Sequence, residues 1–205
     1  MGGIGLRTDI SNWMPLTVPE INQIFSDIPI RWCIAGGWAL DLHLGWQTRE
    51  HGDIDVIITR DEQLIAYKHL NRDWVLYKAE DGQLDLWEDG EYLKSINDVW
   101  LSKSKETPWA FQLMIIDTEE DYWIYKRDQS IRRPIDEIFL NTVEGIPYLR
   151  PEIQLLYKAG ILQVREKDYN DFQTVLPSLL PQEKIWLKSS LNRQFPGGHA
   201  WDKFI

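Results

Sequence analysis

The stretch CIAGGWALDLHLGWQTREHGDIDVIIT, residues 33–59, constrains the fold more than any other part of the chain. Its apolar beginning ends at two glycines. A helical pattern follows, with Leu40 and Leu44 four residues apart, and Gly45 is a typical helix-terminating residue. The last seven residues start with two acids and continue as a Val/Ile run, which is typical of a buried strand. The stretch therefore predicts a strand, a glycine turn, a helix and a second strand.

Asp53 and Asp55 lie two residues apart where the second predicted strand begins. Alternate residues of a strand point to the same side, so both carboxylates project together, with Cα atoms about 6.6 Å apart. Two adjacent carboxylates repel each other unless a cation lies between them. Carboxylate oxygens, phosphate and water are the ligands that Mg²⁺ prefers. The pair therefore predicts a magnesium site.

Gly36 and Gly37 join the first predicted strand to the helix. Glycine allows the backbone to come close to a bulky anion, and a helix N-terminus offers free N–H groups and the positive end of its dipole. We therefore expect these residues to bind phosphate, and together with the two acids they indicate a nucleoside triphosphate site. The sequence contains neither the G-x-x-x-x-G-K-[ST] loop nor the G-x-G-x-x-G dinucleotide motif.

The rest of the chain predicts an α+β protein. Helical patterns cover 17–28 and 60–70, and strand-like runs follow at DWVLYKA, QLDLW, WAFQLMIID and DYWIYKRD. Near residue 130 the pattern changes to a proline-containing connector and then to helical segments that begin at Pro151 and at residues 167 and 182. We therefore expect one domain over residues 1–130, and a connector with a small helical subdomain over 131–205.

These motifs resemble a known family. The sequence Gly-Gly-Trp, the helix with Asp41, and TREHGDID resemble the nucleotidyltransferase fold of the DNA polymerase β superfamily. Within it, the likeness is to aminoglycoside-2''-adenylyltransferase-like and lincosamide nucleotidyltransferase-like proteins, and RRPIDEI, GIPYLRPEIQLLYKAG and KDYNDF extend it over most of the chain. The resemblance implies a mixed β-sheet flanked by helices, with a small C-terminal helical subdomain. It also implies transfer of a nucleoside monophosphate to a hydroxyl group.

In that superfamily the Asp-x-Asp pair holds Mg²⁺, and a third carboxylate on a neighbouring strand activates the attacking hydroxyl. Asp53 and Asp55 match the pair, and two Mg²⁺ ions are expected. Asp117 is the favoured third carboxylate and metal ligand because it ends the apolar run FQLMIID. Asp85 in QLDLW is its rival.

Two cations are candidate ligands for the triphosphate. Arg49 precedes the acidic pair closely enough to reach a phosphate or to offset the carboxylate charge. Lys158 ends the helical run PEIQLLYK on a face that could look back at the triphosphate, although lysine at a helix C-terminus is favourable without any ligand.

The overall charge bears on the acceptor. With 22 Lys and Arg against 32 Asp and Glu, the formal charge is −10. Such a surface repels nucleic acid and attracts cations. We therefore expect AMP transfer from ATP, or from another triphosphate, to a small cationic molecule such as an aminoglycoside-like antibiotic. A non-catalytic, antitoxin-like binding module of the same fold and a nucleotidyltransferase acting on a protein are the alternatives.

The sequence predicts a cytoplasmic protein with no membrane partner. The single cysteine, Cys33, lies in an apolar run, and no apolar stretch approaches the roughly 20 residues needed to span a bilayer. The first ten residues, MGGIGLRTDI, lack the apolar core of a secretory signal.

Overall fold

A computed structural model describes residues 6–80, 82–160 and 163–205, so the first five residues, part of the segment tested for a signal sequence, lie outside it. The chain forms two compact units, Met1–Ile34 with Glu50–Thr118, and Ala35–Arg49 with Glu119–Ile205. The domain boundary expected at residue 130 stays a prediction. The glycine turn and the helix after it belong to the second unit, although they stand between two strands of the first.

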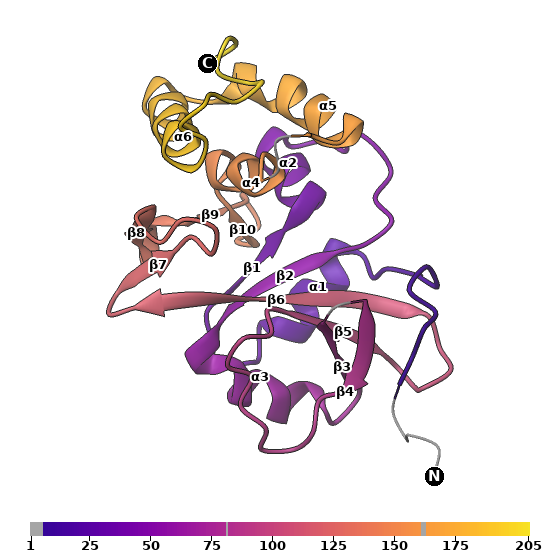
Figure 1. The fold of residues 1–205 in the computed structure, drawn as a ribbon. Coiled ribbons are helices and arrows are strands. Elements are labelled where there is room, and N and C mark those ends of the chain that lie inside the picture. The colour runs from indigo at the N-terminus through magenta and orange to yellow at the C-terminus, as the bar shows by residue number, and fades with distance from the viewer. Residues whose placement is uncertain (1–5, 81, 161–162) are drawn as a thin grey trace. The chain divides into compact units, whose positions relative to one another are not determined.

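The first unit is built on a mixed sheet with the strand order β4-β3-β5-β6-β2-β1 (Figure 1). Strands β2 and β6 are parallel, whereas β5 is antiparallel to both β6 and β3. The predicted mixed sheet flanked by helices is therefore confirmed. The bounds are β1 Trp32–Ala35, β2 Asp55–Thr59, β3 Val75–Glu80, β4 Gln83–Leu86, β5 Asp98–Ser102 and β6 Trp109–Glu119.

Helix α1, Val18–Phe25, supplies part of the core of the first unit. The Glu20 carboxylate accepts a hydrogen bond from the Thr17 backbone N–H (2.8 Å), which closes a capping box at the helix start. The Phe25 ring packs edge-on against Phe111 of β6, with 5.9 Å between ring centroids. After β2 in the chain, the helical region predicted over 60–70 is a 3₁₀ turn, η1 Arg60–Glu62, followed by α3 Gln63–Leu70.

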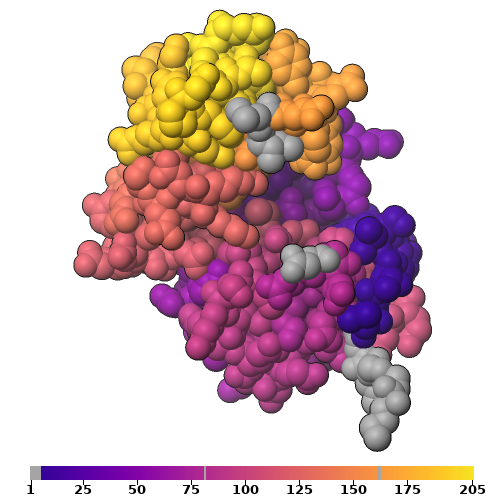
Figure 2. Space-filling model, viewed as in Figure 1, coloured from indigo at the N-terminus to yellow at the C-terminus, as the bar shows by residue number. Residues whose placement is uncertain are grey.

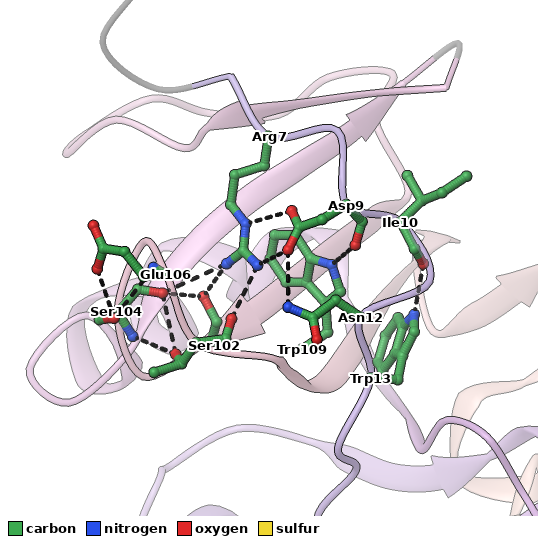
Figure 3. A network of polar contacts seen from close by, with 10 residues as sticks. Arg7, Asp9, Ile10, Asn12, Trp13, Ser102, Ser104, Glu106 and Trp109 are labelled. Atoms are coloured by element: carbon green, nitrogen blue, oxygen red, sulfur yellow. Dashed lines mark hydrogen bonds and ion pairs between the residues drawn. The ribbon is translucent and has the colours of Figure 1, made fainter.

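The N-terminal segment is attached to this sheet by Arg7 (Figure 3). Its guanidinium lies 3.6 Å from the centre of the Trp109 ring and donates two hydrogen bonds to Asp9, at 2.9 and 2.6 Å. It also donates to Ser102 Oγ and the Thr107 carbonyl, both at 2.9 Å. In the space-filling view this indigo segment lies along the surface of the first unit (Figure 2). These contacts fix a segment for which the sequence predicted no structure.

The second unit is mainly helical. Helix α2 packs against α4, α5 and β10, and the Phe172 ring stacks on Trp201, 4.1 Å between centroids, which fixes the C-terminal turn on α5. Short antiparallel strand pairs, β7 with β8 and β9 with β10, follow in the chain (Figure 1). β7 lies in the predicted strand run DYWIYKRD, whereas β8, β9 and β10 lie in the connector predicted from residue 131. The bounds are α2 Gly36–Leu44, β7 Tyr122–Ile124, β8 Arg132–Pro134, η2 Ile135–Glu137, β9 Phe139–Asn141, β10 Pro147–Leu149, α4 Pro151–Lys158, α5 Glu166–Val175, η3 Leu176–Ser178 and α6 Pro181–Gln194.

Across the described ranges 6–80, 82–160 and 163–205, the structure contains no helix whose length and apolar character would allow it to span a bilayer.

Candidate active site

The two acids of the Asp-x-Asp motif flank a fully buried residue at the start of β2. Ile54 has no exposed surface, whereas Asp53 is exposed and Asp55 is half-buried. This is the alternation expected of an extended segment with one face in the core. The backbone is held in place because the Gln112 N–H donates to the Ile54 carbonyl at 3.0 Å. Both acids therefore avoid the core face that Ile54 occupies.

Gln112 of β6 is the direct neighbour of Asp55 across the parallel strand pair. Directly paired residues of adjacent strands project from the same face, so the amide of Gln112 shares a face with the Asp55 carboxylate. The Gln112 Nε2 group donates a hydrogen bond of 2.8 Å to Asp98 Oδ1 on β5. Three adjacent strands therefore carry Asp55 on β2, the Gln112 amide on β6 and the Asp98 carboxylate on β5.

The structure corrects the prediction that Asp117 is the third carboxylate. Ile116 pairs with Thr59, so Asp117 stands level with Arg60, five residues and about 16 Å along the strands from Asp55. The odd offset from Gln112 also turns Asp117 to the opposite face. Its carboxylate is bound by the Arg60 guanidinium, with the Nη2–Oδ2 contact at 3.4 Å.

Asp85, the rival third carboxylate, is also remote from the pair. It is an exposed residue of the edge strand β4, and β3, β5 and β6 separate β4 from β2. Within the part of the chain that the structure describes, no three His, Cys, Asp or Glu side chains form a group that could hold a metal ion. The predicted set of Asp53, Asp55 and Asp117 is therefore wrong as a three-carboxylate metal site.

The residues present still suit Mg²⁺ bound together with a substrate. Mg²⁺ is usually held by one or two protein carboxylates, with phosphate oxygens and water completing its coordination. Asp53 and Asp55 would provide those two carboxylates, because buried Ile54 and the β2–β6 pairing fix the backbone between them.

The glycine turn has a clear conformational reason in the second unit. Gly36 begins α2 with φ +67°, a conformation that side-chain-bearing residues rarely adopt. Its N–H donates to Gln154 Oε1 of α4 at 2.8 Å, and Gly36 itself is buried. The predicted phosphate contact of the Gly36 N–H is therefore not supported, because a protein oxygen already accepts from it. Gly37 is half-exposed, and its phosphate contact stays a prediction.

Arg49 and Lys158 are both bound by carboxylates of the second unit. Arg49 Nε and Nη2 donate to the two oxygens of Asp171 at 2.9 and 3.0 Å, a bidentate pair. Lys158 Nζ lies 2.7 Å from Asp171 Oδ2 and 3.1 Å from Asp168 Oδ1, and its side chain is only 8% exposed. These contacts give both cations carboxylate partners within the second unit, and their nucleotide-binding roles stay predictions.

The pKa values agree with this description. Burial raises the pKa of Asp171, but the hydrogen bond from Arg49 and the charge of Lys158 together outweigh it and leave the pKa below its usual value. The same hydrogen bond raises the pKa of Arg49, and burial only partly opposes that effect. Asp171 and Arg49 are therefore both ionised at neutral pH.

A pocket of about 530 Å³ lies beside the C-terminal half of α2 within the second unit. Trp38, Trp46 and Tyr148 supply aromatic surface, and Glu144 supplies a carboxylate. Trp46 is 58% exposed. Burial lowers the pKa of the neighbouring His43, so this ring is neutral at pH 7. The volume and the lining suit a small organic molecule.

Three residues of this description were missed from the sequence. Gln112 and Asp98 could be found only by knowing how β2, β5 and β6 are aligned, and β5 itself was not predicted. Gln154 lies within the predicted helix that begins at Pro151, but nothing local indicates that its amide reaches Gly36, 118 residues earlier.

Comparisons with known proteins agree with the fold. Residues 17–81 match the family described as aminoglycoside-2''-adenylyltransferase. No curated protein sequence matches the chain.

This chain matches two solved structures over nearly the whole length of each of them. The first is the lincosamide antibiotic adenylyltransferase LnuA, crystallised with lincomycin (22% identity, 80% of this chain and 98% of that one, TM-score 0.55). The second is ANT(2'')-Ia in complex with adenylyl-2''-tobramycin (13% identity, 86% and 97%, TM-score 0.56). The family match and the shared fold confirm the resemblance stated from the sequence: this chain has the nucleotidyltransferase fold and is similar to the aminoglycoside and lincosamide adenylyltransferases.

Proposed function

We propose that this protein is an antibiotic-modifying adenylyltransferase that moves AMP from ATP to a hydroxyl of a small cationic acceptor. The observation that carries the proposal is the pair Asp53 and Asp55 outside buried Ile54, in a segment that matches the aminoglycoside-2''-adenylyltransferase family. The net charge of −10 supports a cationic acceptor, because an acidic surface concentrates cations around the protein.

Asp53 and Asp55 would hold Mg²⁺, which supplies charge stabilisation at the phosphoryl group when it is bound. The protein itself contributes positioning. Buried Ile54 and the pairing of β2 with β6 hold the backbone that carries both acids. Positioning with charge stabilisation accounts for most of the rate in phosphoryl transfer.

The test is calorimetric titration of the protein with ATP, GTP, CTP and UTP in the presence of Mg²⁺. We expect ATP to bind, and Asp53→Asn or Asp55→Asn to weaken the binding at least about tenfold, or ~1.4 kcal/mol. Asp73→Asn is the matched control because Asp73 is an exposed acid of the same unit outside the motif. Equal affinity for ATP in the wild type and all three variants contradicts the proposal. So does a wild-type protein that binds none of the four triphosphates.

The acceptor is identified with α-³²P-labelled ATP and a panel of aminoglycosides, lincosamides and other small amines.

One observation favours the alternative of a non-catalytic module. No group of three acids is found within the described residues, and Gln112 stands opposite Asp55. A module of this kind would bind ATP without releasing pyrophosphate in the presence of any acceptor.

A further inference from the structure

The second unit contains a pocket that the proposed reaction does not use. The pocket has a volume of about 530 Å³, and its lining comes from the C-terminal half of α2, segment 45–47, the β9–β10 turn and Tyr148 of β10. All of these residues belong to the second unit, whereas Asp53 and Asp55 belong to the first. A volume of this size is typical of sites for small organic molecules.

Each wall of the pocket carries one exposed apolar side chain. Of the eleven tryptophans of the chain, all of which the structure describes, only Trp46 is exposed, at 58% of its surface. On the other wall, Val143 of the β9–β10 turn is completely exposed. A scattered apolar residue on a surface is ordinary, but a large aromatic ring exposed at a concave surface offers extensive contact to a ligand. Trp46 and Val143 are therefore candidate contacts for an apolar group.

Hydrogen bonds hold the backbone of both walls. After α2, the Gly45 N–H donates to the Asp41 carbonyl at 2.9 Å, and Thr48 Oγ1 donates to the Asp41 carboxylate at 2.6 Å. In the β9–β10 turn, the Gly145 N–H donates to the Thr142 carbonyl at 3.0 Å. A wall that is already ordered loses little conformational entropy when a ligand binds, which favours affinity.

The charges at the pocket favour a cation. Glu144 supplies an exposed carboxylate and Asp41 a buried one. Within the described part of the chain, the lining includes no lysine and no arginine, and burial lowers the pKa of His43, so that ring adds no positive charge at neutral pH. Trp46 and Tyr148 add aromatic rings, whose faces attract cations. An anion would meet only repulsion from these groups.

We propose that this pocket is a binding site for a small organic cation with an apolar body, such as an alkylated ammonium ion. The Trp46 ring contacts the ammonium group, the Glu144 carboxylate balances its charge, and Val143 covers the apolar part. The inference does not depend on the proposed adenylyl transfer, because no step of that reaction involves these residues.

The test uses benzyltrimethylammonium, which is titrated into the full chain in the absence of ATP. This probe has no hydroxyl group, so it cannot serve as an acceptor of AMP. We expect calorimetry to give a dissociation constant of about 1 mM or lower. In ¹H–¹⁵N NMR spectra the indole N–H signal of Trp46, identified as the one missing from Trp46→Ala, should shift during the titration. Benzyl alcohol and benzoate keep the ring without the positive charge, and both should bind at least about tenfold more weakly.

Two positions test the contacts. Trp46→Ala should weaken the binding of benzyltrimethylammonium at least about tenfold, and Trp46→Phe, which keeps an aromatic ring, should weaken it less. Glu144→Gln should weaken it about threefold, as expected for an exposed ion pair. The matched controls are Tyr122→Ala and Glu137→Gln, which change an exposed aromatic residue and an exposed acid of the same unit outside the pocket. Both controls should bind the probe as the wild type does.

Three results would overturn the inference. The first is wild-type affinity for the probe in Trp46→Ala or in Glu144→Gln, since the cation would then bind elsewhere on the acidic surface. The second is equal affinity of the wild type for benzyl alcohol, because the pocket would then have no preference for a positive charge. The third is no binding of the probe at about 10 mM, roughly ten times the expected dissociation constant. None of these results affects the Mg²⁺-ATP titrations of the Asp53 and Asp55 variants, so a failure here is separate from a failure of the proposed function.

Discussion

Replacing Asp171 by Asn should destabilise the protein by about 2–3 kcal/mol. The carboxylate makes three contacts of 2.7–3.0 Å with Arg49 and Lys158 and is 5% exposed. Removing one partner of a buried ion pair typically costs about 3–5 kcal/mol. The cost here is smaller because Lys158 keeps Asp168 at 3.1 Å, and Arg49, which is 29% exposed, reaches water.

Thermal unfolding followed by circular dichroism measures this effect. For a chain of this length, about 2–3 kcal/mol corresponds to a midpoint lower by roughly 5–10 °C. Glu166→Gln is the control, since Glu166 is an exposed acid in the first turn of the same helix, and surface changes of this kind stay within about 0.5 kcal/mol.

The pH dependence gives an independent check. The pKa of Asp171 is lower in the folded protein than in the unfolded chain, so its contribution is complete above the unfolded value, near 4, and is lost as pH falls through the folded value. The wild type and Asp171→Asn should therefore differ most at neutral pH and converge in acid. A midpoint for Asp171→Asn within about 1 °C of Glu166→Gln at pH 7 would refute this account of the network.

Three further predictions concern stability. Gly36→Ala should lower the free energy of unfolding by about 1–2 kcal/mol in chemical denaturation, because φ is +67° at Gly36. Gly37→Ala is the comparison. An equal effect at both positions would contradict the explanation from the positive φ. Arg7→Lys should destabilise the first unit, because lysine cannot form the two-pronged contact with Asp9 (Figure 3); a fluorescence midpoint equal to that of the wild type would show that the contact contributes nothing. Hydrogen bonding to Arg7 lowers the pKa of Asp9 to about 2. The contribution of the Asp9 carboxylate to the free energy of unfolding should therefore be present above pH 4 and fade toward pH 2. Asp9→Asn should abolish that part of the acid sensitivity in unfolding curves recorded at several pH values.

The elements around the glycine turn were predictable because their signals are local. The helix predicted over 37–45 is α2, Gly36–Leu44, with Gly45 as its left-handed C-cap at φ +80°. The strand predicted over 53–59 is β2, Asp55–Thr59. A glycine at a helix end and an apolar run after two acids act within a few residues, so sequence alone is sufficient there.

The third carboxylate was not predictable because strand alignment is not a local property. Asp117 ends an apolar run, as a site residue would, yet β6 extends for 11 residues and carries Gln112, not Asp117, opposite Asp55. The sequence does not predict strand β5, because DVWLS is short and follows a segment rich in turns.

The cations raised a different difficulty. Arg49 and Lys158 are residue types that bind phosphate and carboxylate equally well, so only the position of Asp171 on a distant helix distinguishes the two roles. The two compact units divide the chain in a way that no local signal indicates. Helix α2 is contiguous in sequence with two strands of the first unit, yet its apolar side packs on α4 and α5.

The alternation at the start of β2 limits how this gene segment can change by insertion or deletion. A single residue gained or lost between Asp53 and Asp55 would break the spacing that leaves both acids outside the core while Ile54 is buried. Homologous chains should therefore keep a constant spacing across 53–55 and confine length variation to the irregular stretch between Gly45 and Gly52.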